Sequence, residues 1–141
     1  MIGELALICA ALFAGAAIFV NVAEQPARLA LDDKAMLLQW RRSYNRAAPM
    51  QAGLALVSAL LGFTAAWLTR DPRWIVGALL ILANWPFTLL IIKPTNDRLH
   101  ATLPEQADAE TRRLVESWGW LHACRSAFGL AATAAYLWTM P

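Results

Sequence analysis

Charged residues are almost missing from four long stretches of this 141-residue chain. No Asp, Glu, Lys or Arg occurs at positions 5–23, 47–69 or 74–92, and Arg125 is the only charged residue after Glu116. A helix needs about 20 mostly apolar residues to cross the hydrocarbon core of a bilayer. Because the backbone must satisfy its own hydrogen bonds there, each stretch is predicted to be helical. The alternative, a soluble bundle, is disfavoured because soluble cores rarely contain such long uncharged runs.

Several motifs that carry common chemistries are also absent. The chain has no Gly-rich phosphate loop, no HExxH metal motif and no serine nucleophile motif. Its two cysteines, Cys9 and Cys124, form no CxxC pair and are expected in opposite halves of the bilayer, so we expect no disulfide. The net charge of +2 comes from basic residues beside the apolar stretches. These indicate membrane topology, and we expect no nucleic-acid partner.

The four stretches predict an all-α fold, an integral membrane four-helix bundle in a single domain over residues 1–141. Its helices are expected near residues 3–23, 49–69, 74–93 and 117–139. The first stretch could instead be a cleaved signal peptide, but the start from Met1 to Glu4 lacks the positive region of such peptides. Small residues recur at four-residue spacing, as at Ala11 and Gly15. They favour close packing either within the bundle or in a homo-oligomer.

Basic residues are concentrated in the two long loops. Only Arg70 and Arg73 fall on the opposite side of the predicted bundle. The loops hold nine of the 12 Lys and Arg residues: Arg28, Lys34, Arg41, Arg42, Arg46, Lys93, Arg98, Arg112 and Arg113. The positive-inside rule therefore predicts a multi-pass protein of the inner (plasma) membrane, with long loops cytoplasmic and both termini outside.

The first long loop is predicted to contain an amphipathic cytoplasmic helix between the first two membrane helices. Asp32 or Asp33 can cap a segment that continues to about Arg46. Its apolar and aromatic side chains, among them Trp40 and Tyr44, recur every four residues and therefore share one face. This pattern is typical of helices that lie on the membrane surface, and a lid over the bundle end is the alternative.

Arg125 and His122 are the candidate catalytic residues. Arg125 lies about 12 Å into the fourth predicted helix. A buried membrane Arg is costly unless it is paired or faces a polar cavity, so it indicates a functional site, with snorkelling toward the headgroups as the alternative. His122 and Trp118 share its helical face. His122 is interpreted as a general base, or as a structural hydrogen-bonding group. A haem with two axial histidines is disfavoured because His100 lies in a loop.

Further polar and aromatic side chains converge on the predicted cytoplasmic half. Pro86 removes a backbone hydrogen bond from the third helix, as is tolerated where a membrane helix lines a cavity. The candidate substrate-binding residues are Asn21, Glu24, Trp40, Tyr44, Asn84, Thr88, Asn96 and Trp118. Glu24 is the expected partner of Arg125 or of a cytoplasmic Arg. A metal held by His122 and Glu24 is an alternative, although two ligands on different helices form an incomplete site.

Four segments in combination resemble a known family. They are Asn21-Val22-Ala23-Glu24-Gln25-Pro26, then Trp40-Arg41-Arg42-Ser43-Tyr44-Asn45-Arg46, then Trp85-Pro86-Phe87-Thr88 with Pro94-Thr95-Asn96, and Trp118 through His122 to Arg125. Over about residues 5–135 the chain resembles the anthrone-oxygenase-like family of small four-helix membrane proteins. The resemblance implies a four-helix membrane fold and, from fungal members, oxidation of anthrones to anthraquinones with dioxygen. The abundance of Ala, Trp and Arg over Lys indicates a bacterial chain.

The resemblance and the His122–Arg125 pair together suggest a membrane-embedded oxygenase for a hydrophobic aromatic, anthrone- or quinol-like substrate. His122 would remove a proton and Arg125 would stabilise the resulting oxyanion. Asn21, Thr88 and Asn96 would orient the substrate, and Trp118 or Tyr44 would stack on its ring. No cofactor is expected, because an electron-rich carbanion can reduce oxygen directly. The alternative is a non-enzymatic membrane protein that binds a lipid, a quinone or a partner helix in the same pocket.

Overall fold

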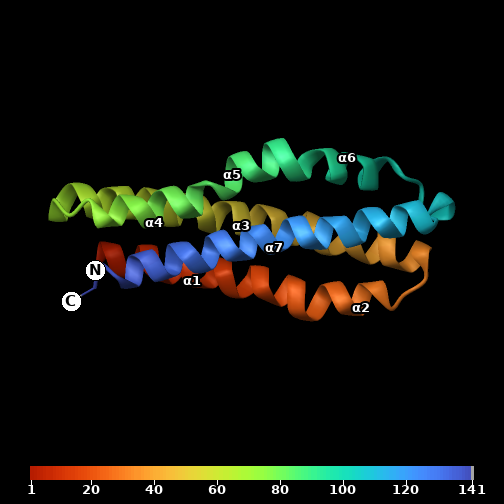
Figure 1. Ribbon diagram of the computed structural model, residues 1–141, viewed down its shortest axis with the longest axis horizontal. Helices are drawn as coiled ribbons and strands as arrows, with labels where there is room; N and C mark the ends of the chain where they lie inside the picture. Colours follow the sequence, from red (N-terminus) through yellow and green to blue (C-terminus); the bar gives the residue numbers. More distant parts are fainter. Residues whose placement is uncertain (141) are drawn as a thin grey trace.

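The computed structural model describes residues 1–140, and nearly all of them are helical. Four long helical segments run side by side along one axis (Figure 1). The first comprises α1 (Ile2–Phe19), η1 (Val20–Glu24) and α2 (Gln25–Leu29), and the second is α3 (Asp33–Thr69). The third comprises α4 (Arg73–Leu82), α5 (Asn84–Phe87), η2 (Thr88–Ile92) and α6 (Lys93–Ala101). The short η3 (Pro104–Gln106) leads to the fourth, α7 (Ala109–Leu137). The predicted all-α four-helix bundle is confirmed.

The two ends of the bundle differ in how the helices are connected. We call the end with residues 30–32 and 102–108 the basic end, and the end with residues 70–72 the turn end. At the turn end Arg70 adopts a left-handed conformation with φ 59°, which stops α3. The carboxylate of Asp71 then accepts a hydrogen bond from the backbone N–H of Arg73 at 3.0 Å and starts α4. This tight turn sets α3 and α4 side by side.

Three of the four segments are long and apolar enough to cross a membrane: Ile2–Leu29, Asp33–Thr69 and Arg73–Ala101. Among the helices of residues 1–140, α7 is long enough but not apolar enough to be counted with these three. Arg125, His122 and other polar residues lower its mean hydropathy. It nevertheless packs along the other three segments (Figure 1). The 37 residues of α3 make a helix about 55 Å long. A hydrocarbon core measures about 30 Å, so the bundle extends beyond it.

The predicted helices are each present but extend further toward the basic end than expected. The side chain of Asp32 accepts a hydrogen bond from the backbone N–H of Ala35 at 2.9 Å and thereby caps α3. Asp108 and Thr111 form a capping box that starts α7. Hydrogen bonds from Thr111 to the Asp108 carboxylate hold the pKa of that carboxyl below its usual value. Asp32 is one of the two caps predicted for the first loop, and both caps extend helices beyond the apolar stretches.

The amphipathic segment expected between the first two membrane helices is part of the bundle. It forms the N-terminal portion of α3 and continues into the membrane helix without a break. Met36, Leu37 and Trp40 on its apolar face are fully buried against the other segments. The expected amphipathic helix is therefore present, and its apolar face packs on protein, as in the alternative of a lid over the bundle end.

Two π-helical turns interrupt the helices near the basic end. η1 directly precedes the helix that contains Pro26, and η2 directly precedes the helix that contains Pro94. A proline inside a helix clashes with the carbonyl four residues earlier, and a wider turn relieves that clash. η1 carries Asn21 and Glu24, and η2 carries Thr88. The wider turns thus set the direction of predicted site residues.

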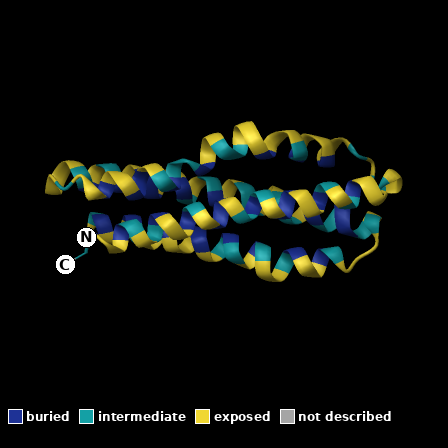
Figure 2. Cartoon of the chain, in the orientation of Figure 1, coloured by how far each residue is buried: buried dark blue, intermediate teal, exposed yellow. Residues whose placement is uncertain are grey.

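Side chains of different size fill the two ends of the core, and buried positions face inward along every segment (Figure 2). Near the turn end the core is formed by Ala6, Ala10, Ala65, Trp74 and Tyr136. Near the basic end it is formed by bulkier residues: Val20, Met36, Leu37, Trp40, Ile92, Leu99, Val115 and Trp118. Ala11 and Gly15 face outward, so a homo-oligomer through small residues stays a prediction.

Candidate functional site

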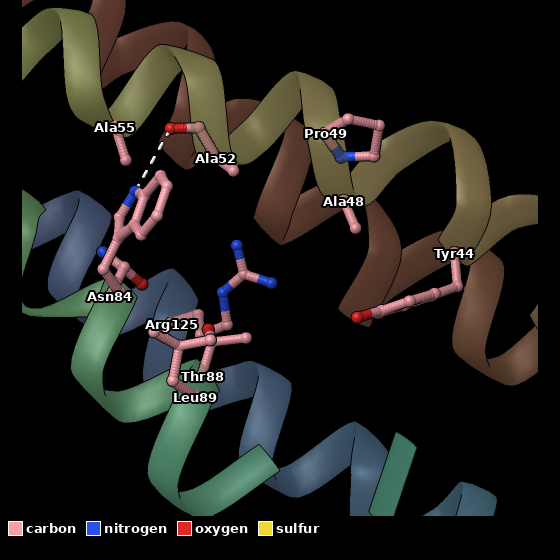
Figure 3. A pocket seen from close by; sticks show the side chains of 10 residues that line it. Tyr44, Ala48, Pro49, Ala52, Ala55, Asn84, Thr88, Leu89 and Arg125 are labelled. Carbon is pink, nitrogen blue, oxygen red and sulfur yellow. Dashed lines mark hydrogen bonds between the residues drawn. The ribbon is translucent and has the colours of Figure 1, made fainter. Parts of the chain in front are cut away.

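A cavity of about 270 Å³ opens between α3, the α5–η2 region and α7 (Figure 3). It is lined by Tyr44, Ala48, Pro49, Ala52, Ala55, Asn84, Trp85, Thr88, Leu89 and Arg125. The indole Nε1 of Trp85 donates to the carbonyl of Ala52 at 3.3 Å and joins the third segment to α3 across one wall. Mostly apolar walls with a few polar groups are typical of sites for small molecules.

Arg125 points into this cavity and has no counter-charge (Figure 3). Its side chain is only 6% exposed, and no carboxylate of residues 1–140 forms an ion pair with it. Its Nε has no hydrogen-bond partner among these residues, while its Cζ lies 5.6 Å from the ring centre of Phe13. An unpaired buried cation is costly, so the cavity favours an occupant with negative charge or strong acceptors.

Glu24 pairs with a basic residue other than Arg125. Its Oε2 accepts hydrogen bonds from Arg28 at 3.0 Å and from the hydroxyl of Ser43 at 2.7 Å. Of the two kinds of partner predicted for Glu24, Arg125 is not the one found, and Arg28 from the predicted first loop takes that place. The guanidinium of Arg28 also lies over the ring of Trp118 at 5.3 Å. These contacts join the first segment, α3 and α7, and none of Glu24, Arg28 and Ser43 lines the cavity.

The surroundings of His122 determine which ring nitrogen carries the proton. The amide nitrogen of Asn21 donates to the carbonyl of Gly119 at 2.9 Å, so the amide oxygen of Asn21 faces His122. That oxygen accepts from the hydroxyl of Ser126 at 2.8 Å and lies 3.0 Å from Nδ1 of His122. Nδ1 must therefore donate, and we assign the proton to it. Nε2 is left with a free lone pair and, among residues 1–140, with no partner.

His122 borders a small void beside the cavity. The void has a volume of about 10 Å³, roughly the space for one water molecule. Its walls are Val20, Ser43, Tyr44, Ala47, Ala48, Gln51, Trp118, His122 and Arg125. Tyr44, Ala48 and Arg125 border both the void and the larger cavity. The void therefore lies between His122 and residues of the cavity wall.

Behind the cavity, a chain of hydrogen bonds connects α7, α6 and α3. The indole Nε1 of Trp118 donates to Oδ1 of Asn96 at 2.9 Å, and Nδ2 of Asn96 donates to the hydroxyl oxygen of Tyr44 at 2.9 Å. Trp40 stacks on the ring of Tyr44, with centroids 5.0 Å apart and planes 14° apart. It also meets Trp118 edge-on at 5.9 Å. This arrangement fixes the position of Tyr44 from behind.

The predicted site residues thus divide into two groups. Those that line the cavity are Tyr44, Asn84, Thr88 and Arg125. Four others lie behind the cavity: Asn21 contacts His122, Trp40 and Asn96 contact Tyr44, and Trp118 contacts Asn96. Glu24 does not line the cavity and pairs with Arg28 and Ser43. His122 lies between the groups, at the void.

Sequence reasoning missed Gln51 and Arg28. Gln51 is 1% exposed, and neither polar atom of its amide has a hydrogen-bond partner among the described residues. It borders the void beside His122. It is the only amide side chain in the uncharged stretch 47–69, which is a signal that could have identified it. Arg28 was read as a topology signal, although it is 1% exposed.

Within residues 1–140, no three or more His, Cys, Asp and Glu side chains are close enough together to hold a metal ion. Of the suggested pair, Glu24 already accepts hydrogen bonds from Arg28 and Ser43, and the Nδ1 of His122 is bonded to Asn21. Cys9 and Cys124 are both free.

Comparison with known proteins identifies the family. The family model described as anthrone oxygenase matches residues 40–135, which include most of α3, the third segment and most of α7. The chain belongs to the anthrone oxygenase family. The match contains every residue that lines the cavity, the hydrogen-bond chain and all the walls of the void except Val20, and it leaves out Asn21.

Curated relatives extend the similarity to most of the chain. An anthrone oxygenase of Aspergillus fumigatus is 32% identical over 136 residues, which cover 89% of this chain and 84% of that protein. An anthrone oxygenase of Paecilomyces divaricatus is 29% identical over 137 residues, covering 86% and 84%. A noranthrone monooxygenase of Aspergillus flavus is 28% identical over 128 residues, covering 82% of this chain but 58% of that protein.

No solved structure matches the chain. The curated relatives are fungal, so the bacterial source that the composition indicates stays a prediction.

Proposed function

We propose that this protein is a membrane oxygenase that converts an anthrone-type substrate to the corresponding quinone with dioxygen. The names of its relatives support the substrate class. The observation that carries the proposal is the unpaired Arg125 in a cavity beside the free lone pair of His122. A ketone that loses an acidic C–H proton becomes an enolate, with negative charge on its oxygen. Its formation needs this combination of a base and a cation.

The size and polarity of the cavity fit a flat three-ring ketone. Its volume of about 270 Å³ is close to the lower end of the range for ligand sites, roughly 300–1,000 Å³. Alanine side chains and Leu89 provide apolar walls, while Thr88 and Asn84 each have a buried oxygen without a partner in the described chain. Hydroxyl groups on the substrate rings would donate to these oxygens.

The proposed reaction begins with proton transfer. Nε2 of His122 takes a proton from the methylene carbon opposite the carbonyl group, and the electron pair moves onto the carbonyl oxygen beside Arg125. The Nδ1–H···Oδ1 hydrogen bond to Asn21 holds the imidazole and stabilises the imidazolium that forms. Arg125 lowers the energy of the enolate because the enolate provides the counter-charge that no carboxylate of residues 1–140 provides.

Dioxygen then oxidises the enolate. A C–O bond forms at the former methylene carbon, and the peroxide takes up the proton held by His122. Loss of the second hydrogen from that carbon and cleavage of the O–O bond yield the quinone carbonyl and water. One dioxygen is consumed for each anthrone, one quinone and one water are released, and no external reductant is required. The proposal therefore includes no cofactor.

The decisive experiment measures turnover of the purified protein in detergent. With an anthrone and dissolved dioxygen, we expect one dioxygen consumed for each anthraquinone formed. His122→Ala is expected to lower kcat about 1,000-fold, within the usual contribution of general base catalysis. His100→Gln is the control, because this second histidine is exposed and borders neither the cavity nor the void, and glutamine keeps a side chain packed beside Tyr44. It should keep kcat within about twofold of wild type.

Two results would contradict the proposal. An H122A protein that oxidises the anthrone as fast as wild type would remove His122 from the mechanism. A wild-type protein that binds an anthrone or a quinone without consuming dioxygen would instead support the non-enzymatic alternative.

A further inference from the structure

We infer that the hydroxyl group of Tyr44 donates a hydrogen bond to the same substrate oxygen that Arg125 contacts, so that the two residues form an oxyanion hole. The inference deepens the proposed function and rests on it for the identity of the substrate. It assigns Tyr44 a different role from the ring stacking that the sequence suggested.

The direction of the hydrogen bonds behind Tyr44 follows from the chemistry of one group. An indole N–H can only donate, so Oδ1 of Asn96 must be the atom that faces Trp118. The amide nitrogen of Asn96 is then the atom that faces Tyr44, and it can only donate. The hydroxyl oxygen of Tyr44 therefore accepts in this contact. Its own proton remains free to be donated elsewhere.

The surroundings of Tyr44 leave the cavity as the place for that proton. Among residues 1–140, the hydroxyl has no other hydrogen-bond partner. Trp40 covers a face of the ring, and His100 approaches it edge-on with centroids 5.4 Å apart. The hydroxyl end of Tyr44 and the guanidinium of Arg125 are both directed into the cavity (Figure 3).

Tyr44 and Arg125 are also close to one another. Both border the void of about 10 Å³ as well as the larger cavity. They come from different segments, α3 and α7, and so approach a ligand from two sides. Two donors that converge on one oxygen stabilise an enolate more than the neutral ketone, because negative charge builds up on that oxygen.

The first test compares the two tyrosines of the chain. Tyr44→Phe removes the donor and keeps the ring, and we expect kcat to fall about 100-fold with a small change in KM. Tyr136→Phe is the matched control. The hydroxyl of Tyr136 donates to the carbonyl of Ser58 at 3.0 Å near the turn end, away from the cavity. This variant should be less stable but keep the wild-type kcat per folded protein.

The second test needs no turnover. The infrared carbonyl stretch of bound anthraquinone reports hydrogen bonds to its oxygen, and we expect Y44F to shift it to higher wavenumber while Y136F leaves it unchanged. Trp118→Phe should shift it in the same direction, because Asn96 can then turn and accept the proton of Tyr44. W118F keeps an aromatic ring in the core. It tests the direction of the hydrogen bonds from Trp118 through Asn96 to Tyr44.

The outcomes separate the two proposals. Wild-type kcat and an unshifted carbonyl stretch in Y44F would overturn the role of Tyr44 and leave the oxygenase in place. A wild-type protein that binds anthraquinone with the expected shift, but consumes no dioxygen, would overturn the oxygenase and keep the Tyr44 assignment. A wild-type protein that fails to bind anthraquinone would overturn both.

Discussion

The two ends of the bundle contain the two tyrosines of the chain in opposite situations. Tyr136, near the turn end, is fully buried against Gly62 and Gly77, and its hydroxyl donates to the carbonyl of Ser58. Tyr44, toward the basic end, accepts a hydrogen bond from Asn96 and keeps its own proton. The first tyrosine completes a packed core, and the second presents a donor to a cavity.

The same difference extends to the other buried polar atoms. At the turn end, the hydroxyls of Ser58 and Thr139 donate to backbone carbonyls at 2.8 and 2.6 Å. The buried side-chain atoms without a partner in residues 1–140 all lie elsewhere, on Gln25, Arg28, Gln39, Trp40, Gln51, Asn84, Thr88 and Arg125. A protein gains no stability from such atoms. Four of these residues, Gln51, Asn84, Thr88 and Arg125, border the cavity or the void, whereas the buried hydroxyls at the turn end are already paired within the protein.

The largest effect that should separate the two ends comes from Arg125. Arg125→Met keeps much of the side-chain volume but removes the charge. We expect kcat for an anthrone to fall 100-fold to 1,000-fold, because an oxyanion donor is lost. The thermal midpoint should rise, because the variant no longer buries an unpaired cation. The free energy of unfolding should increase by roughly 1 kcal/mol. Dioxygen consumption and thermal unfolding in detergent measure the two changes.

Arg125→Lys is the matched control for this prediction. It keeps the charge but not the planar donor geometry, so it should retain more activity than R125M and gain less stability. If R125M lowers both activity and stability, Arg125 has a structural role, and the contrast between the ends is lost.

A smaller effect of the opposite kind is expected at the turn end. A Cβ atom at residue 62 would overlap the hydroxyl oxygen of Tyr136. Gly62→Ala should therefore lower the free energy of unfolding by about 1–3 kcal/mol, as overpacking does. The kcat of the folded protein should stay unchanged. Thermal unfolding and oxygen uptake measure the two quantities.

The double variant G62A/Y136F tests the cause of this loss. Removing the hydroxyl relieves part of the overlap, so the two substitutions together should destabilise by less than the sum of their single effects. Additive effects would show that the helices move apart instead of pressing on the ring.

The membrane bundle was predictable because absence of charge is a strong signal. Runs such as 5–23 and 47–69 contain no charged residue, and only a lipid environment favours this. The ends of the helices were not predictable in the same way. Residues 33–46 are amphipathic, and such a pattern fits packing on protein and packing on lipid equally well. Only the burial of Trp40 within the bundle decides between them.

The candidate site was predictable in part for a similar reason. Helical spacing places Trp118, His122 and Arg125 on one face, and the structure has all three buried. Spacing within one helix carries no information about partners on other helices. Whether Glu24 pairs with Arg125 or with Arg28 depends on the relative orientation of the first segment and α7. The π-helical turn η1, which contains Glu24, contributes to that orientation.

Asn21 provides the smallest and most specific test of how the basic end supports catalysis. It lies behind His122, outside the cavity walls, so Asn21→Leu should leave KM nearly unchanged. Without an acceptor at Nδ1, the imidazole is free to adopt the other tautomer and lose its basic Nε2 lone pair. We expect kcat to fall about tenfold, the cost of roughly 1.4 kcal/mol in transition-state stabilisation. Asn21→Asp keeps acceptor oxygens for His122 and Ser126 and should retain more activity than N21L. A change in KM without a change in kcat would place Asn21 in contact with the substrate and make the assigned tautomer of His122 irrelevant to the reaction.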